Sequence, residues 1–374
     1  MDILKSEIVK DMGNGAHSLQ AIDATRIQLA KSAYTTRRVD KQAIVSLLSG
    51  DINPWPGDLV LAKVVKIGQH KRIELEHGRR APLFIGDEII ICYGDRYAPD
   101  QFEAKVPSDL AECHLVAAGG IASRSLSQHG KIKAPTLIQP LGLLAGIDGK
   151  RINLSEWALP SNTSINPNPR PFIITVAGTS MNAGKTTTAA HLIKGLVRSG
   201  MKVGAAKITG TGAGGDRWLM KDAGACEVLD FTDAGFASTF RLPLEKIEDI
   251  AYRLTGHLRN NGVDAIVLEI ADGLFQQETA QLLTQPAFQS SIDAIIFAAG
   301  DSMGASCGVD WLQRKGLPVI ALSGCVSAST LSSREAESAT GLPVMGLEQL
   351  SSAGVAVELF EQYGEPNNKR VQVG

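Results

Sequence analysis

Residues 178–187 read GTSMNAGKTT, which places glycines beside a lysine and two threonines. Backbone N–H groups in such a loop, and at the start of a following helix, bind phosphate oxygens, and glycine lets the backbone come close to them. Lys185 would neutralise the β- and γ-phosphates, and the Thr186 hydroxyl would ligate Mg²⁺. We therefore predict that the chain binds a nucleoside triphosphate with Mg²⁺. The predicted contacts in this loop are Gly178, Thr179, Asn182, Ala183, Gly184, Lys185, Thr186 and Thr187.

The residues on either side of this loop have the apolar patterns of a strand and a helix, which a phosphate site needs. An apolar run, Phe172–Ala177, predicts a buried strand before the loop, and Leu192, Leu196 and Val197 predict a helix after it. Strand, glycine loop and helix therefore occur in the required order. The two glycines are one residue further apart than in the commonest G-x-x-x-x-G-K-[ST] pattern. The loop also lacks a lysine at its start, which disfavours the chromosome-partitioning ATPases.

The pattern G-T-x-x-x-x-G-K-T resembles the loop of dethiobiotin synthetase and its relatives among the ATP-dependent synthetases. In that family the second strand ends in a lysine, a glycine-rich segment leads to a magnesium-binding aspartate, and a third acid ends the next buried strand. Here Lys207 ends an apolar run, residues 210–215 read GTGAGG before Asp216, and Glu269 ends the run that starts at Ala265. The similarity extends from Pro171 to Leu350 and implies a homodimer.

The chemistry of these side chains can also be stated without the family. Mg²⁺ prefers oxygen ligands, which Thr186, Asp216 and Glu269 would supply directly or through water. Lys185 and Lys207 are the predicted catalytic residues, because they would offset charge as the γ-phosphoryl group is transferred. The alternatives are a solvated strand end for Lys207, a helix N-cap for Asp216 and a merely structural role for Glu269.

Two further segments bear on the ligands. Ser323 and Gly324 lie where the family contacts adenine, and we predict that they bind the nucleotide, although the family's Asn-Asp pair is absent. Adenine is favoured over guanine because no Asn-Lys-x-Asp motif occurs. Ala271-Asp272-Gly273 departs from the family's glycine-rich turn, so the acceptor is expected to differ. The glycine-rich stretch Thr209–Asp216 predicts either a loop that orders over the phosphates or a plain surface loop.

The wider pattern predicts two domains. Buried-strand runs alternating with helical stretches after residue 170 predict a doubly wound α/β domain with a mainly parallel sheet. Short β-rich runs between turn residues predict a smaller, barrel-like β-rich domain before it. The expected boundaries are a helical segment over 1–45, the β-rich domain over 46–160, a linker over 161–170 and the nucleotide domain over 171–374.

Composition limits the classes of partner. The net charge of −2 gives no field that would attract nucleic acid or an anionic membrane, and no apolar run is long enough to cross a bilayer. We expect a cytoplasmic protein with reduced cysteines. Basic clusters at 69–72 and 77–80 keep a nucleic-acid partner open as the less favoured reading. Dispersed histidines disfavour a zinc site.

The favoured hypothesis is an ATP- and Mg²⁺-dependent enzyme that activates a small-molecule acceptor, such as a carboxylate, by phosphoryl transfer. The alternative is a regulatory NTPase whose N-terminal β domain engages a protein or nucleic acid. The two differ in whether a small molecule or a macromolecule stimulates turnover.

Overall fold

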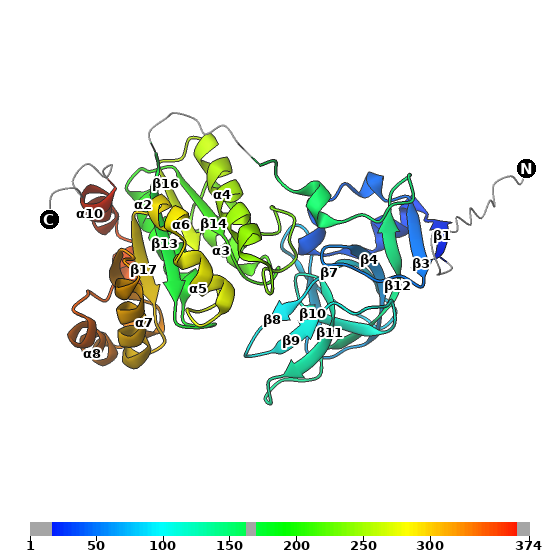
Figure 1. The fold of residues 1–374 in the computed structure, drawn as a ribbon, viewed down its shortest axis with the longest axis horizontal. Coiled ribbons are helices and arrows are strands. Elements are labelled where there is room, and N and C mark those ends of the chain that lie inside the picture. The colour runs from blue at the N-terminus through cyan, green and yellow to red at the C-terminus, as the bar shows by residue number, and fades with distance from the viewer. Residues whose placement is uncertain (1–16, 162–169, 365–374) are drawn as a thin grey trace, which may run out of the picture. The chain divides into compact units, whose positions relative to one another are not determined.

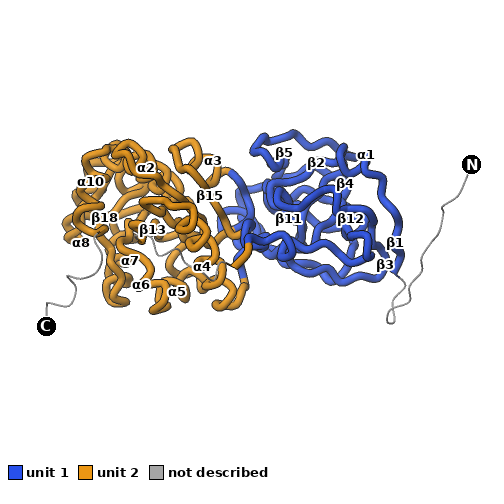
Figure 2. The backbone as a smooth tube through the Cα atoms, turned by 90° about the horizontal axis from the view of Figure 1, so that it is seen from above, with its two compact units in different colours: residues 1–159, 211–214, 232–240 blue, residues 160–210, 215–231, 241–374 orange. Residues whose placement is uncertain are grey.

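The computed structural model describes residues 17–161 and 170–364. The chain divides into two compact units, which Figure 2 distinguishes by colour. Unit 1 comprises Met1–Leu159 together with Thr211–Gly214 and Thr232–Phe240, and unit 2 comprises Pro160–Gly210, Gly215–Phe231 and Arg241–Gly374. The division thus falls beside the predicted boundary at 160. The return of two short segments to unit 1 was not predicted, and most of the predicted linker, 162–169, lies outside the described residues.

The centre of unit 1 is a closed ring of five paired strands (Figure 1). In ring order they are β4 (Leu59–Lys66), β7 (Glu88–Tyr93), β11 (Ile121–Gln128), β10 (Cys113–Ala117) and β12 (Thr136–Ala145). The ring closes because β12 pairs with both β10 and β4. The remaining strands are β1 (His17–Ala21), β2 (Lys31–Ser32), β3 (Ser46–Gly50), β5 (Arg72–Glu74), β6 (Arg80–Pro82), β8 (Arg96–Tyr97) and β9 (Phe102–Lys105). The predicted barrel-like β-rich domain is confirmed.

The ring strands β4 and β7 have buried apolar residues on both faces, which explains their apolar runs. In β4, Leu59 and Leu61 belong to one core cluster, whereas Val60 and Ala62 belong to another. Successive side chains of a strand point to opposite faces, so each face of the strand faces its own core. An unbroken apolar run in an antiparallel strand therefore indicates, in this barrel, that other residues pack against both faces of the strand.

The described part of the N-terminal segment corrects the expectation of a helical region over 1–45. It contains β1, one short helix α1 (Ala24–Leu29), β2 and two 3₁₀ turns, η1 (Tyr34–Thr36) and η2 (Lys41–Ala43). β1 pairs with β3 along its whole length. That pairing supplies backbone hydrogen bonds from a distant segment, which no local apolar pattern reveals.

The segments that return to unit 1 are held by contacts within that unit. The Arg37 guanidinium lies 2.6 Å from the Asp233 carboxylate, and both side chains are buried. The backbone N–H of Gly212 donates to the Ala237 carbonyl, so the two segments also bond to each other. A third turn, η3 (Leu154–Trp157), ends the main stretch of unit 1.

Unit 2 has one six-stranded parallel sheet in the order β15-β14-β16-β13-β17-β18. The strands are β13 (Phe172–Gly178), β14 (Val203–Lys207), β15 (Glu227–Asp230), β16 (Ala265–Glu269), β17 (Ala294–Ala298) and β18 (Val319–Ser323). The helical elements are α2 (Lys185–Arg198), α3 (Gly215–Asp222), α4 (Leu244–Asn260), α5 (Gln277–Leu283), α6 (Pro286–Ser291), α7 (Ser302–Arg314), η4 (Cys325–Ala328), α8 (Thr330–Thr340), α9 (Leu347–Leu350) and α10 (Ala353–Tyr363). The predicted doubly wound α/β domain is confirmed.

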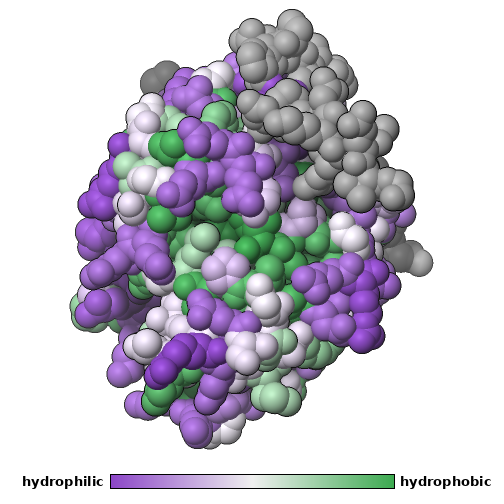
Figure 3. All heavy atoms as spheres, turned by 90° about the vertical axis from the view of Figure 1, so that its left-hand side faces the viewer, coloured by the Kyte–Doolittle hydropathy of each residue, from purple (hydrophilic) through white to green (hydrophobic). Residues whose placement is uncertain are grey.

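Helices cover both faces of this sheet. Ile174 and Val176 of β13 belong to the core that α2, α9 and α10 cover. Ile173, one residue along, points to the opposite face, which α4, α5, α6 and α7 cover. The end of unit 2 that carries α8 and α10 shows apolar residues gathered among polar ones (Figure 3), and exposed apolar side chains of these helices include Leu331 and Phe360.

Candidate nucleotide site

The carboxyl ends of neighbouring strands bring the predicted residues of unit 2 together. Gly178 ends β13, Lys207 ends β14 and Glu269 ends β16. Lys207 and Glu269 are directly opposite each other in the pairing of β14 with β16. Open parallel sheets bind their ligands at the carboxyl ends of the strands, near the point where the strand order reverses.

The phosphate loop joins β13 to the N-terminus of α2. Two of its residues have positive φ, Asn182 at 65° and Gly184 at 95°. A Cβ at Gly184 would lie 2.9 Å from the Gly324 Cα, so glycine is required there by both backbone angle and space. Lys185, Thr186 and Thr187 then form the first turn of α2, whose N–H groups have no partner within the helix. The loop therefore offers backbone donors to an anion.

Lys185 lies folded over this loop. Its side chain is buried, and its Nζ donates to the Ser180 carbonyl at 2.6 Å. Burial lowers the pKa of Lys185, and the neighbouring acids Glu269 and Asp272 oppose that shift. The acids favour the charged form of Lys185, and a charge shielded from water interacts more strongly with a phosphate than an exposed one.

Lys207, Asp216 and Glu269 form one charged group beside the loop. The Lys207 Nζ pairs with the Asp216 carboxylate and lies 3.3 Å from Glu269 Oε1. Thr186 Oγ1 donates to the same Glu269 oxygen at 3.1 Å. Burial would lower the pKa of Lys207, but Asp216 and Glu269 outweigh it and hold that pKa above its ordinary value. Burial raises the pKa of Glu269 in spite of Lys207.

The residues present fit Mg²⁺ brought by a nucleotide. Glu269 is 1% exposed, and its Oε2 has no hydrogen-bond partner among the described residues. Across residues 17–161 and 170–364, no cluster of three or more His, Cys, Asp or Glu side chains could hold a metal by itself. Mg²⁺ typically takes one or two carboxylates and completes its shell with water and phosphate oxygens. The Thr186 hydroxyl with Asp216 and Glu269 matches that pattern.

The structure corrects two of the alternatives. Lys207 is not a solvated strand end, because it is paired with two acids. Asp216 is not a helix N-cap, because it is the second residue of α3 and its carboxylate pairs with Lys207.

That Ser323 and Gly324 contact the nucleotide stays a prediction, and the structure shows which protein groups surround them. Ser323 is fully buried; its hydroxyl accepts from Thr188 and donates to the Met345 carbonyl. A Cβ on Gly324 would lie 2.2 Å from the Ala183 carbonyl oxygen. Gly324 therefore packs against the phosphate loop, and the Ser323 hydroxyl is hydrogen-bonded within unit 2.

Asp272 is a further acid of the site that the sequence did not assign. It follows Glu269 by three residues, and its charge raises the pKa of both Lys185 and Lys207. The neighbouring Ala271 carbonyl accepts from Thr209 and, at 2.7 Å, from Thr279. The departure of Ala271-Asp272-Gly273 from the synthetase pattern was the available signal.

The glycine-rich stretch is not a free loop in this structure. Thr211 forms a bridge with Ser238, and Gly212 donates to Ala237. The Gly214 N–H donates to Glu74 Oε2 at 2.7 Å, and Glu74 is buried. Hydrogen bonds within unit 1 therefore fix Thr211–Gly214.

A small apolar cavity of about 80 Å³ lies beside the loop residue Thr179. The loop after β16 and the helix α7 provide the other walls. Its lining residues are Thr179, Leu274, Phe275, Phe297, Gly304, Cys307, Gly308 and Trp311. The site thus has an apolar compartment next to its phosphate-binding backbone.

No protein-family model matches the chain, and no curated protein sequence does either. Among solved structures, it is similar to signal recognition particle 54 kDa protein from Aeropyrum pernix K1 in complex with GDP, at 20% identity and a TM-score of 0.35, over 56% of this chain and 53% of that one. It is also similar to the receptor FtsY from Elizabethkingia anophelis in complex with GDP, at 14% identity and a TM-score of 0.32, over 55% and 58%. It is similar as well to cell division protein FtsY from Thermotoga maritima, at 16% identity and a TM-score of 0.33, over 51% of this chain and 66% of that one.

The chain thus spans about half the length of the first of these structures. The similarity to these structures is distant and does not bear on activity. In the described residues, no helix is both long and apolar enough to cross a membrane.

Proposed function

We propose that unit 2 is a Mg²⁺-dependent ATP-binding enzyme that transfers or cleaves the γ-phosphate. The observation that carries this proposal is the buried Oε2 of Glu269, which has no hydrogen-bond partner in the described part of the chain and belongs to the carboxylate that bonds Thr186 and faces Lys207. An unpaired buried carboxylate oxygen costs free energy unless a ligand uses it. A cation brought by a phosphate would use it.

Each residue of the site has a role that its surroundings support. The N–H groups at the start of α2 would bind phosphate oxygens, and Lys185 would leave the Ser180 carbonyl to neutralise them. Lys207, kept charged by its two acids, would offset charge that develops on the transferred group. Bound Mg²⁺ would supply charge neutralisation between the phosphates, held by Thr186, Asp216 and Glu269.

We further propose that the enzyme activates a small acceptor, as a synthetase, ligase or kinase. The apolar cavity beside Thr179 supports this, because it would hold the apolar part of an acceptor next to the phosphates. The family resemblance points to a carboxylate or a similar nucleophile. Dethiobiotin synthesis itself is not proposed, because Asp272 stands in a turn where that family has glycines.

The test is nucleotide hydrolysis by the purified chain with ATP or GTP and Mg²⁺, alone and with a metabolite extract. Stimulation by the small-molecule fraction with ATP supports the proposal. Lys185→Ala should abolish that turnover with the fold intact. Full turnover in this variant would contradict the assignment of the phosphate site.

A regulatory NTPase is the second candidate, and the glycine-rich segment favours it. Thr211–Gly214 belong to unit 1, whereas Lys207 and Asp216, which flank them in the chain, belong to unit 2. Any movement of Asp216 on nucleotide binding would therefore be transmitted along the chain to Thr211–Gly214, where Gly214 bonds Glu74. In this account Glu74→Ala changes the basal hydrolysis rate, and a protein or nucleic acid stimulates it. An enzyme of the first kind would show neither effect.

The homodimer also stays a proposal, based on the family resemblance. The mass of the purified chain in solution, measured with and without Mg²⁺ and a non-hydrolysable ATP analogue, would test it.

A further inference from the structure

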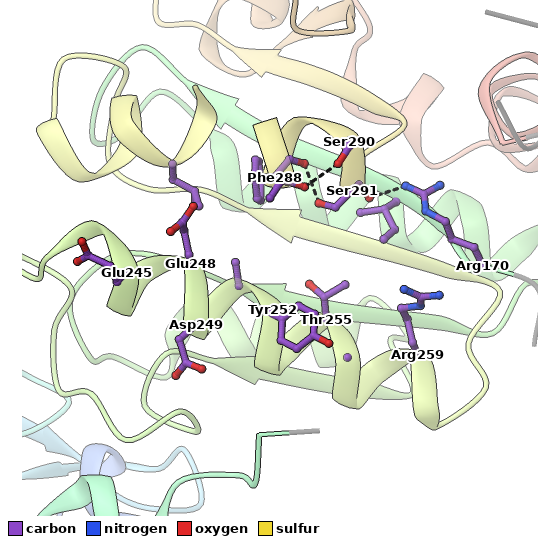
Figure 4. A pocket seen from close by; sticks show the side chains of 15 residues that line it. Arg170, Glu245, Glu248, Asp249, Tyr252, Thr255, Arg259, Phe288, Ser290 and Ser291 are labelled. Carbon is purple, nitrogen blue, oxygen red and sulfur yellow. Dashed lines mark hydrogen bonds between the residues drawn. The ribbon is translucent and has the colours of Figure 1, made fainter. Parts of the chain in front are cut away.

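A groove of about 700 Å³ runs beside α4 on the face of the unit 2 sheet that α4 to α7 cover (Figure 4). Its apolar lining is buried and comprises Ile173, Ala251, Leu282 and Phe288. The groove exists because α5 and α6 have only 7 and 6 residues, so they cover less of the sheet than the 17-residue α4 does. No residue of the phosphate loop lines it, so it is a separate site.

Gly256 lets the groove reach the backbone of α4. It lies in the interior of the helix and is buried, yet a Cβ added there would meet no atom within 4 Å. Glycine weakens a helix interior relative to alanine. No packing contact requires glycine at this position, and the space above it is open to an occupant.

One end of the groove is positively charged. Arg170 and Arg259 lie together there in Figure 4. Arg170 pairs with Asp293 at 2.6 Å, whereas the guanidinium of Arg259 makes no ion pair or hydrogen bond with any residue in the described ranges. Burial and the like charge of Arg170 lower the pKa of Arg259. An anion bound here would relieve the repulsion and supply the missing partner.

The other end is negatively charged. Glu245, Glu248 and Asp249 lie there, at the start of α4 (Figure 4). Asp249 pairs with Arg253, but neither glutamate has an ion-pair partner within the described part of the chain. Arg259 follows Glu248 by eleven positions, so at a rise of 1.5 Å per residue the two charged ends are roughly 16 Å apart.

We propose that this groove binds an elongated small molecule with an apolar chain, an anionic group at Arg259 and a cationic group at Glu245 and Glu248. Each part of that ligand matches a part of the groove: a buried apolar floor, and a guanidinium and two carboxylates that have no ion-pair partner among the residues described. The site does not depend on the proposed nucleotide chemistry, so each can fail without the other.

The first test is calorimetric titration of the full chain with three probes: ω-aminododecanoate, dodecanoate and dodecylamine, each below its aggregation concentration. The proposal predicts that ω-aminododecanoate binds most tightly. Arg259→Gln should weaken the two carboxylate probes by about tenfold or more, as expected for a lost charge-assisted hydrogen bond, and leave dodecylamine unchanged. Arg314→Gln, which removes a last-turn arginine from α7, is the matched control and should change nothing.

The second test fills the groove. Gly256→Leu should weaken all three probes by at least about tenfold, because its side chain occupies the space that they need. Gly256→Ala is the companion variant; its Cβ meets no atom, so it should fold at least as well as wild type and weaken binding less. The proposal is overturned if none of the probes binds, or if wild type, Gly256→Leu and Arg259→Gln bind them equally.

Discussion

Glu269→Gln should separate the activity of unit 2 from its stability, because the two depend on the Glu269 charge in opposite ways. Glu269 is 1% exposed, and its Oε1 accepts from Thr186 while facing Lys207 at 3.3 Å. Its Oε2 has no partner among the described residues. Glutamine keeps the size of the side chain and removes its charge.

Turnover with Mg²⁺ and nucleotide should fall by about 10²–10³-fold, the usual loss when one preorganised electrostatic group is removed. Stability should not fall, because the ionised carboxylate is buried with one oxygen unpaired. The sign follows from the pKa of Glu269, which burial raises despite the attraction of Lys207. A group whose pKa is raised in the folded state stabilises the fold at pH values below its unfolded-state pKa. This contribution is lost as the pH rises through the folded-state pKa. Above the folded-state pKa, the ionised Glu269 is therefore a cost to stability.

The assay is the hydrolysis rate across a Mg²⁺ titration, together with thermal unfolding of the same samples. Glu278→Gln is the matched control: Glu278 is another buried glutamate of unit 2, and its carboxylate accepts from the Arg241 N–H. Its loss should leave turnover unchanged. Wild-type turnover of Glu269→Gln at every Mg²⁺ concentration would refute the metal role of Glu269, and a large fall in its melting temperature would refute the stability argument.

Three further predictions concern the loop, its support and unit 1. Lys185→Ala should reduce hydrolysis by about 10³-fold or more without lowering the melting temperature, and residual turnover near the wild-type rate would contradict this. Gly324→Ala should destabilise unit 2 by about 1–3 kcal/mol more than Gly316→Ala, because both have positive φ but only the first places a Cβ against the Ala183 carbonyl; equal losses in denaturant unfolding would argue against that support. Burial, with a smaller effect of Arg96, lowers the pKa of His70 from 6.5 to about 4, so the unfolded chain binds its proton first as pH falls. Stability should therefore drop by about 1.4 kcal/mol per pH unit between these values, and His70→Gln should remove that slope in denaturant titrations.

Much of unit 2 could be predicted from sequence because each of its signals is local. The strand before Gly178, the loop and the helix after Lys185 are contiguous, and a buried parallel strand shows itself as an unbroken apolar run. Asp216, Glu269 and Lys207 were assigned to the site through the resemblance to the dethiobiotin synthetase family. The edge of a parallel sheet then brings Lys207 and Glu269 together, as the register confirms.

The remaining features depend on contacts between distant segments. The pairing of β1 with β3 turned an expected helical segment into strand. The role of Ser323 depends on Thr188 and on the Met345 carbonyl, and neither is adjacent in sequence. The bond between Gly214 and Glu74 joins residues 140 positions apart, so a glycine-rich run that predicted a loop is held in place.

The nucleotide site is tested most directly by calorimetric titration of the full chain with a non-hydrolysable ATP analogue, with and without Mg²⁺. We expect one site per chain in wild type, binding that is weaker by about tenfold or more without Mg²⁺, and loss of binding in Lys185→Ala. Binding that is the same with and without Mg²⁺, or that survives in Lys185→Ala, would contradict this expectation.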